Sequence, residues 1–326
     1  MSTELNVVST FRFSEASQQM LSEAAGAPIV CVTGEELVTR LANADVLCSN
    51  DIPANLGQLA RRPRWIQVPS AGVDALKPTG LLDAGSEIII TTASGIHATT
   101  ICEYVFGSML IFNWNWPQMM RLQSQHTWAR SPSWYHLGRR ELIGQTLGIV
   151  GVGSIGRQIA KLGHAFGMRV LGMRRSLPAD ELKDADVDAY YTQERLHDLL
   201  GQSDYVVLAV PLTPATEKLI GEAELRAMRA NAYLVNIARG RVVDEQALIQ
   251  ALKEGWIAGA GLDVTEEEPL PPDSPLYGMQ NVILTPHISG NSIHYEERLA
   301  ELFAENMRRF RAGEELLNRY DAARGY

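Results

Sequence analysis

Cysteine is scarce in this sequence, and its distribution argues against a disulfide or metal scaffold. Three cysteines, Cys31, Cys48 and Cys102, occur among 326 residues, and no C-x-x-C motif is present. An odd number of isolated cysteines in apolar surroundings indicates reduced, packed thiols. None of the seven histidines neighbours a cysteine, and no two are spaced four residues apart. We therefore predict no metal site.

Long hydrophobic segments are also missing. The longest apolar stretches, such as residues 104–114, are interrupted by Gly, Ser or Asn. They fall short of the roughly 20 residues that a membrane span requires. The first ten residues lack a basic region followed by an apolar core, so no secretory signal is visible. The sequence therefore predicts a cytoplasmic protein.

Positive charge is in deficit as well. Lys and Arg number 29 against 38 Asp and Glu, which gives a formal net charge of -9. This acidic balance disfavours nucleic acids and anionic membrane surfaces as partners, although it is compatible with a local basic pocket for phosphate or carboxylate. With 46% apolar and 21% charged residues, the composition is that of an ordinary globular protein. The length favours two domains.

Short apolar runs alternate with helical patterns along most of the chain. Strands are predicted at residues 5–8, 29–32, 46–48, 65–68, 87–91, 147–150, 168–172, 205–210, 233–237, 257–264 and 282–285. Helices are predicted at residues 14–25, with Ser14 as the N-cap, and at 34–44, 101–113, 193–200, 222–230, 244–253 and 292–310. Strands and helices that take turns in this way favour an α/β protein built on parallel sheets.

A glycine-rich turn follows the strand predicted at residues 147–150. Gly151, Gly153 and Gly156 form the pattern G-x-G-x-x-G, and an amphipathic helix follows. Gly151 would permit the tight turn, Gly153 the close approach of a pyrophosphate, and Gly156 the contact between helix and strand. The diphosphate would bind the N–H groups at the helix N-terminus. Ordinary turns also produce this pattern, but the flanking strand and helix favour a dinucleotide fingerprint.

The segment from residue 114 to residue 144 differs from the rest of the chain. It carries four of the six tryptophans and four arginines, and it shows no strand pattern. These residues are Trp114, Trp116, Trp128, Trp134, Arg121, Arg130, Arg139 and Arg140. Aromatic and arginine side chains are enriched at protein interfaces. We favour a homodimer interface over local packing of the rings beneath a long loop.

Polar residues follow three late strands, where an open parallel sheet places its active site. Arg239 stands between a buried strand and a glycine, where it could hold a carboxylate bidentately. Arg241 is the competing candidate. His287 follows the last strand, and three consecutive glutamates occur at Glu266–Glu268. Composition does not choose among the glutamates.

Two earlier loops could also contact a ligand. Ser70, Ala71 and Gly72 follow a predicted strand, and their small side chains would let backbone N–H groups point at an anion. The second loop contains His97 and leads into a predicted helix. Ordinary turns explain both loops about equally well, so composition leaves their role open.

Taken together and in order, these motifs resemble those of the D-isomer-specific 2-hydroxyacid dehydrogenases. The resemblance covers nearly the whole chain. The matching blocks are Ser70-Ala-Gly-Val-Asp74, Gly148-Ile-Val-Gly-Val-Gly-Ser-Ile-Gly156, Val210-Pro-Leu-Thr-Pro214, Asn236-Ile-Ala-Arg-Gly-Arg241, Leu262-Asp-Val264 with Glu268-Pro269, and Pro286-His287. It implies two doubly wound parallel-sheet domains, with a Rossmann cofactor domain (residues 99–289) inserted into a flavodoxin-like substrate domain (residues 1–98 and 290–326).

The resemblance also assigns roles to residues. It implies that Arg239, Glu268 and His287 are catalytic, with Glu268 selected because the family's glutamate directly precedes the proline. The substrate would contact Arg239, His287 and the backbone of Ser70, Ala71 and Gly72. Asp263 would hold the nicotinamide carboxamide. The full set expected to bind the cofactor is Gly151, Gly153, Ser154, Ile155, Gly156, Arg174, Arg175, Ser176, Val210, Pro211, Thr216, Ile237, Ala238, Asp263, Ser289 and Gly290.

The residue types suit this chemistry. A Glu268 carboxylate beside His287 would favour the imidazolium, which could protonate a carbonyl oxygen while hydride arrives from the nicotinamide. Arg239 would orient the acid and stabilise negative charge on that oxygen. We expect hydride transfer between a nicotinamide cofactor and a small 2-oxo or 2-hydroxy acid such as glyoxylate or hydroxypyruvate. The alternative is a dinucleotide-sensing binding protein of the same fold, similar to the family's corepressors.

The second strand of the cofactor domain indicates which dinucleotide binds. Where NAD-using members of the family carry an aspartate for the ribose 2′-hydroxyl, this chain has Arg174, followed by Arg175 and Ser176. Two guanidinium groups and a hydroxyl suit a 2′-phosphate, whereas the nearest acids, Asp180 and Glu181, lie beyond a proline. The alternative is a solvated basic loop. We predict that the enzyme prefers NADP(H), with NAD(H) as a second cofactor.

Overall fold

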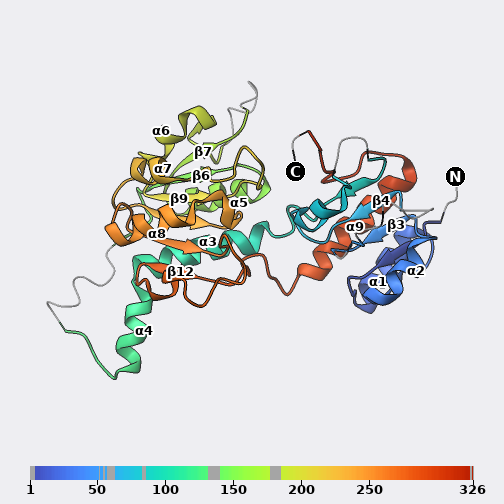
Figure 1. Ribbon diagram of the computed structural model, residues 1–326, viewed down its shortest axis with the longest axis horizontal. Helices are drawn as coiled ribbons and strands as arrows, with labels where there is room; N and C mark the ends of the chain where they lie inside the picture. The colour runs from blue at the N-terminus through green and yellow to red at the C-terminus, as the bar shows by residue number, and fades with distance from the viewer. Residues whose placement is uncertain are drawn as a thin grey trace. The chain divides into compact units, whose positions relative to one another are not determined.

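The chain divides into two compact units. The computed structural model describes residues 4–50, 52–53, 56, 63–82, 86–130, 140–176, 185–323 and 325. Unit 1 comprises Met1–His97 together with Ser292–Tyr326, and unit 2 comprises Ala98–Asn291. The chain therefore leaves unit 1 after its last strand, builds the whole of unit 2 and returns to finish unit 1 with a helix (Figure 1).

Unit 1 is built on a five-stranded parallel sheet. The strands are β1 (Val7–Ser9), β2 (Val30–Cys31), β3 (Val46–Cys48), β4 (Trp65–Gln67) and β5 (Ile89–Thr91). They are arranged in the order β2-β1-β3-β4-β5, with every pair parallel. This is the flavodoxin-like order. The switch in direction lies between β1 and β3.

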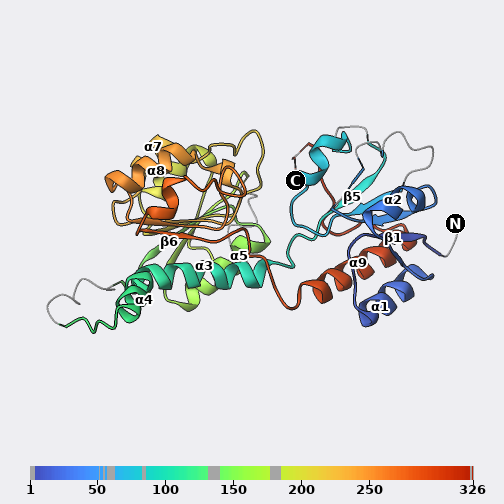
Figure 2. The same ribbon diagram turned by 60° about the horizontal axis from the view of Figure 1, so that its bottom comes forward.

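Helices cover both faces of this sheet. On one face α1 (Glu15–Ala25) packs beside α9 (Tyr295–Ala312), although the two are almost 300 residues apart in the sequence (Figures 1 and 2). The other face is covered by α2 (Gly34–Leu41) and the 3-10 helix η2 (Asp74–Thr79). The predicted N-cap of α1 is confirmed, because Ser14 Oγ accepts a hydrogen bond from the Ser17 N–H at 3.3 Å.

Unit 2 is built on a seven-stranded parallel sheet. The strands are β6 (Thr146–Val150), β7 (Arg169–Met173), β8 (Ala189–Tyr191), β9 (Tyr205–Leu208), β10 (Tyr233–Asn236), β11 (Gly259–Leu262) and β12 (Val282–Leu284). Their order is β12-β11-β10-β9-β6-β7-β8. Counted from β6, this is the Rossmann order with one further strand at the edge. The predicted fold class, two parallel-sheet α/β domains, is confirmed.

Two hydrophobic cores hold unit 2 together, one on each face of its sheet. On one face lie α3 (Ala98–Asn113) and α5 (Ser154–Ala165), and on the other lie α6 (Leu196–Leu200), α7 (Glu222–Ala227) and α8 (Glu245–Glu254) (Figure 2). The remaining short helices are η5 (Gln193–Arg195), η6 (Gly240–Val242) and η7 (Pro275–Gly278). Because both faces are covered, the inner strands are buried and appear as apolar runs in the sequence.

Among the strands and α-helices of unit 2, β8 and α4 (Trp116–Ser124) were not predicted. Strand β8 (Ala-Tyr-Tyr) lies at the edge of the sheet and only one of its three residues is buried, so no run of aliphatic residues marks it in the sequence. Helix α4 occupies part of the segment 114–144, for which we predicted no helix and noted no strand pattern. None of its nine residues is buried, so it has no hydrophobic stripe that packs within the unit. It extends away from the rest of unit 2 (Figure 1).

Helix lengths bear on membrane association. Within the described ranges, no helix combines the length and the apolar character needed to cross a membrane. The longest helix, α9, has 18 residues and carries acidic side chains in its first turn and basic ones in its last.

Candidate active site

The predicted site residues of unit 2 follow strands of one parallel sheet. Each comes shortly after the carboxyl end of a strand: Gly151 after β6, Arg174 after β7, Val210 after β9, Arg239 after β10, Asp263 after β11 and His287 after β12. The carboxyl ends of parallel strands share one edge, which is where open α/β sheets bind ligands. Six separate stretches of sequence therefore meet along this edge.

The glycine turn has the geometry of a phosphate-binding loop. Gly151 has a φ of +105°, and a Cβ added there would collide with the Ala209 carbonyl. A Cβ at Gly156 would overlap the Gly151 carbonyl oxygen, so the close packing of α5 on the turn requires glycine. A Cβ at Gly153 would meet no protein atom within 4 Å, and no side chain caps α5 at that residue. The turn and the helix N-terminus therefore fit a diphosphate.

His287 and Glu268 are joined by a hydrogen bond. His287 Nδ1–H donates to Glu268 Oε2 at 2.8 Å, and both side chains are partly exposed. The other carboxylate oxygen, Oε1, accepts from the Thr265 N–H at 3.2 Å. Composition did not distinguish among the three consecutive glutamates 266–268. In the structure, Glu268 is the one that contacts the histidine. A carboxylate only accepts hydrogen bonds, so the contact fixes a proton on Nδ1.

Asp263 anchors the loop that carries His287. Asp263 is 2% exposed, and its carboxyl group accepts hydrogen bonds from Thr285 Oγ1 at 2.6 Å, from the Ile288 N–H at 2.9 Å and from the Ser289 N–H at 2.9 Å. Its carbonyl accepts from the His287 N–H at 2.8 Å. His287 has a φ of +55°, a left-handed conformation that costs a non-glycine residue about 1–2 kcal/mol. These four bonds hold the loop in that conformation.

A residue that sequence reasoning missed extends this network into the core. Tyr104 of α3 donates to Thr285 Oγ1 at 2.8 Å, and Thr285 in turn donates to Asp263. Burial raises the pKa of Tyr104 to about 12, with a smaller contribution from the Asp263 charge, so the hydroxyl keeps its proton. In the sequence, Tyr104 stands out only as part of an apolar helical segment. No sequence pattern relates it to Thr285.

Arg239 lies in a turn that packs against the Glu268 segment. Asn236, 1% exposed, shapes this turn by accepting from the Ala238 N–H at 3.0 Å and donating to the Arg239 carbonyl at 3.1 Å. A Cβ on Gly240 would overlap the Thr265 backbone, so the two turns touch. The competing candidate, Arg241, is paired with Glu217. The turn that carries both arginines therefore lies beside the segment that carries Glu268, and the Arg241 guanidinium is engaged with Glu217.

The remaining predicted cofactor residues differ in what they can offer a ligand. Arg174 is half-buried at the end of β7, with its N–H bonded to the Tyr191 carbonyl at 3.1 Å, while Arg175 and Ser176 are exposed. The acids at 180 and 181 lie outside the described residues. Ile237 and Ala238 are buried, so only their backbone could contact a ligand. Five further predicted residues at the same edge are exposed or half-buried: Ser154, Ile155, Pro211, Thr216 and Gly290. Thr216 Oγ1 donates to the Pro211 carbonyl at 2.6 Å.

The predicted substrate loop belongs to unit 1. Ser70, Ala71 and Gly72 are half-buried and follow β4. The Ser70 hydroxyl is 2.8 Å from the Gly72 carbonyl and 3.2 Å from Asn50 Oδ1. His97, at the end of unit 1, is 8% exposed, and its ring centre lies 5.2 Å from that of Tyr295.

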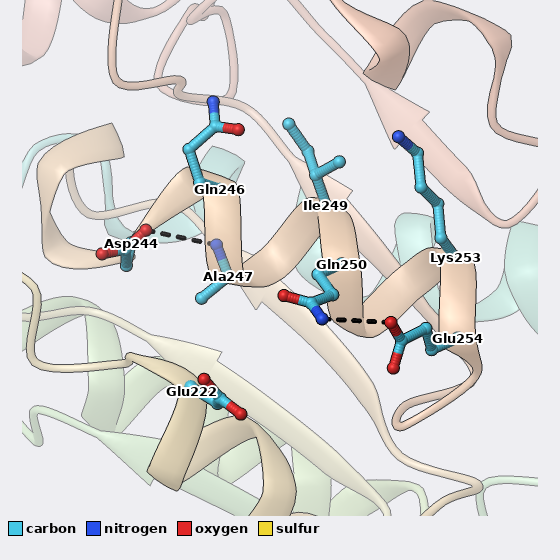
Figure 3. Close-up of a pocket in the computed structure, with 8 residues that line it drawn as sticks. All are labelled: Glu222, Asp244, Gln246, Ala247, Ile249, Gln250, Lys253 and Glu254. Atoms are coloured by element: carbon cyan, nitrogen blue, oxygen red, sulfur yellow. Dashed lines mark hydrogen bonds between the residues drawn. The ribbon is translucent and has the colours of Figure 1, made fainter.

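A hollow of about 570 Å³ occurs elsewhere in unit 2, between α7 and α8 (Figure 3). Its acidic residues are engaged within the protein: Asp244 accepts from the Ala247 N–H, and Glu254 accepts from Gln250 (Figure 3). Glu222 pairs with Arg226 at 2.8 Å. None of the predicted site residues lines this hollow, so we do not assign it as the active site. Across the described ranges, no group of three or more His, Cys, Asp or Glu side chains could hold a metal ion.

Comparison with known proteins identifies the family. The family model for the D-isomer specific 2-hydroxyacid dehydrogenase NAD binding domain matches residues 106–289. A glyoxylate reductase of Korarchaeum cryptofilum is 38% identical over 288 residues, which cover 85% of this chain and 83% of that protein.

Solved structures agree with the sequence comparison. A D-isomer specific 2-hydroxyacid dehydrogenase family protein of Aeromonas salmonicida is 32% identical, with a TM-score of 0.80 over 98% of this chain and 100% of its own. An NADPH-dependent glyoxylate/hydroxypyruvate reductase of Sinorhizobium meliloti, solved with NADP and sulfate, is 26% identical, with a TM-score of 0.82 over 99% of this chain and 100% of its own. The resemblance inferred from the motifs is therefore confirmed. The chain belongs to the D-isomer-specific 2-hydroxyacid dehydrogenase family and is an NAD(P)-dependent oxidoreductase.

Proposed function

We propose that this enzyme reduces a small 2-oxo acid of the glyoxylate or hydroxypyruvate class, with NADPH preferred over NADH. The observation that carries the proposal is the His287–Glu268 pair at 2.8 Å, beyond the same sheet edge that presents Arg239 and the glycine turn. The similarity to a glyoxylate reductase and to an NADPH-dependent glyoxylate/hydroxypyruvate reductase supports this substrate class.

Each proposed catalytic residue has a distinct task. A bound reduced nicotinamide supplies hydride to the carbonyl carbon. His287 delivers a proton from Nε2 to the carbonyl oxygen, since Nδ1 is occupied by Glu268. The Glu268 carboxylate orients the imidazole through this hydrogen bond. Arg239 holds the substrate and offsets the negative charge that develops on oxygen. In the opposite direction His287 accepts the proton.

Asp263 acts in this scheme through His287. Three hydrogen bonds to its carboxyl group and one to its carbonyl hold residues 285–289, so it fixes the position of the imidazole relative to the sheet edge. Contact between Asp263 and the nicotinamide carboxamide stays a prediction. At most one of the roughly four acceptor positions of a carboxylate is left for it.

The proposed preference for NADPH rests on Arg174 and its neighbours. Arg174 directly follows β7, the strand beside β6, where an enzyme that uses NAD would present a carboxylate to the ribose. A guanidinium at this place can bind a 2′-phosphate with charge-assisted hydrogen bonds. Arg175 and Ser176 offer further donors from the same exposed stretch.

A panel of 2-oxo acids assayed with NADPH and with NADH tests the function. We expect the highest kcat/KM with glyoxylate or hydroxypyruvate, and a value for NADPH at least about tenfold above that for NADH. In Arg174→Ala, kcat/KM for NADPH should fall roughly 10- to 100-fold, since hydrogen bonds to charged groups contribute about 1.5–3 kcal/mol. The value for NADH should change little.

Arg169→Ala provides a matched control, because Arg169 begins the strand at whose other end Arg174 lies. This variant should leave kcat/KM for NADPH and for NADH unchanged. A wild-type enzyme that prefers NADH would contradict the cofactor assignment. Absence of turnover with every acid and both cofactors would instead favour the dinucleotide-sensing alternative.

We further propose that the enzyme is a homodimer that associates through α4 and its flanks. The side chains of Trp114 and Trp116 are 56% exposed, Met120 is 65% exposed and Trp128 is 89% exposed. Helix α4 buries none of its residues within unit 2. Exposed tryptophans concentrated on one projecting element are typical of an interface, and homo-oligomers most often pair such a patch with its own copy. Trp134 and Arg139 of the predicted interface lie outside the described residues.

Sedimentation equilibrium checks the dimer. A double variant, Trp116→Ala with Met120→Ala, should weaken the dimer by roughly 30-fold or more in Kd, since buried tryptophans at interfaces typically contribute at least about 2 kcal/mol. Tyr277→Ala is the control, because Tyr277 is 59% exposed elsewhere in unit 2. A wild-type protein that sediments as a monomer at all concentrations would contradict the proposal.

A further inference from the structure

The loop Ser70–Gly72 is held through its carbonyl groups. Tyr295 Oη donates to the Pro69 carbonyl at 2.6 Å, and the Ala93 N–H donates to the Ser70 carbonyl at 2.9 Å. Ser70 Oγ donates to the Gly72 carbonyl at 2.8 Å. All of these residues belong to unit 1. Three of the carbonyls in this turn are thus fixed by donors within the protein.

Fixing a carbonyl also fixes an N–H group. The peptide unit is planar and trans, so its C=O and the N–H of the next residue point in opposite directions. The bond from Tyr295 to the Pro69 carbonyl therefore sets the direction of the Ser70 N–H, and the bond to the Ser70 carbonyl sets that of the Ala71 N–H. Within the described part of the chain, neither N–H donates to a protein acceptor.

Tyr295 is itself firmly placed. It is the first residue of α9, and its ring lies 5.2 Å from that of His97 and 5.9 Å from that of Phe11. Two further hydrogen bonds join the first turn of α9 to the N-terminal part of unit 1. Arg298 donates to the Ile96 carbonyl at 3.3 Å, and Glu296 accepts from the Ser14 N–H at 2.6 Å. The Tyr295 hydroxyl therefore reaches the Pro69 carbonyl from a fixed point.

The hydroxyl also stays a donor. Burial raises the pKa of Tyr295 above its usual value, with a smaller contribution from Cys48. Tyr295 therefore keeps its proton throughout the physiological pH range. Its bond to Pro69 spans 226 residues of sequence and joins the returning part of the chain to the loop after β4.

We propose that Tyr295 is a positioning residue for substrate binding: by holding the Pro69 carbonyl, it aims the Ser70 N–H at the substrate carboxylate. This inference rests on the proposed function, in which the Ser70–Gly72 backbone receives the carboxylate of a 2-oxo acid. A carboxylate held in this way is bound equally in the ground state and in the transition state. Its loss therefore raises KM and leaves kcat unchanged.

The variant Tyr295→Phe tests the role of the hydroxyl and keeps the ring contacts with His97 and Phe11. We expect KM for glyoxylate to rise about two- to tenfold, which corresponds to the loss of one hydrogen bond. The Ki of oxalate, which binds through its carboxylates without turnover, should rise by the same factor. The kcat and the KM for NADPH should stay within about twofold of wild type, and the melting temperature should move by only a few degrees.

Tyr277→Phe is the matched control, because the Tyr277 hydroxyl donates to the Leu270 carbonyl at 3.1 Å in unit 2. It should change neither KM nor Ki. An unchanged KM and oxalate Ki in Tyr295→Phe, with an active wild-type enzyme, would overturn the role of Tyr295 alone. A parallel loss of kcat, cofactor binding and melting temperature would show a merely structural residue. A wild-type enzyme that reduces no 2-oxo acid would instead overturn the proposed function.

Discussion

Replacement of His287 by alanine is expected to lower kcat by roughly 10²- to 10⁴-fold, because a positioned acid or base typically contributes that much to a rate. The variant removes the ring that Glu268 contacts and the proton proposed to reach the carbonyl oxygen. The KM for the cofactor should change little, since the glycine turn after β6 is untouched. Steady-state kinetics in both directions provide the measurement.

A second histidine serves as the control for this experiment. His197 Nε2 lies 2.9 Å from Glu224 Oε1, and its side chain is 55% exposed, against 49% for His287. The two pairs have nearly the same distance, but His197 contacts its glutamate through Nε2 rather than Nδ1 and lies in α6 rather than after a strand. His197→Ala should therefore retain the wild-type kcat. Near wild-type turnover in His287→Ala would refute the assignment of the acid.

Replacement of Arg239 by glutamine is expected to lower kcat/KM for the 2-oxo acid by roughly 10²- to 10³-fold, the usual effect of removing one donor that stabilises a developing oxyanion. Both KM and kcat should worsen, because the guanidinium is proposed to bind the substrate and to offset charge in the transition state. Arg239→Lys should be intermediate at best, since an ammonium keeps the charge but lacks the planar fork of donors.

Arg241 is the matched control, two residues away in the same turn. Its guanidinium is paired with Glu217 and its side chain is 54% exposed. Arg241→Gln should leave kcat/KM within about twofold of wild type, because isolated surface pairs contribute little. If Arg241→Gln were the damaging variant and Arg239→Gln the silent one, the two candidates would have to be exchanged.

Most of the sheet structure could be predicted from the sequence, since it rests on local patterns. Strands buried on both faces appear as apolar runs, and the glycine turn after residues 147–150 is recognised by its spacing together with the flanking strand and helix. Strand β8 and helix α4 were missed for opposite reasons. The strand lies at the sheet edge and contains no aliphatic run, and the helix turns no apolar face toward its own unit. One predicted helix, at residues 193–200, is divided into η5 and α6.

The candidate site was predicted residue by residue, but not as a set of contacts. The residue types and their places after strands pointed to Arg239 and His287, and the resemblance selected Glu268 from its acidic run. The network that holds His287, from Tyr104 through Thr285 to Asp263, was not foreseen. Its members come from α3, from the β12 loop and from the end of β11, and no spacing in the sequence relates them.

The sequence by itself determined the family, the two parallel-sheet domains and the chemical groups available at the sheet edge, because motifs and periodicity are properties of neighbouring residues. Only the tertiary structure decided which of these groups touch. It joined Glu268 to His287, buried Asp263 beneath the His287 loop and brought Tyr295 to the Pro69 carbonyl. Such contacts depend on how crossovers bring distant strand ends together, and that geometry is fixed only when the sheets and their cores are packed.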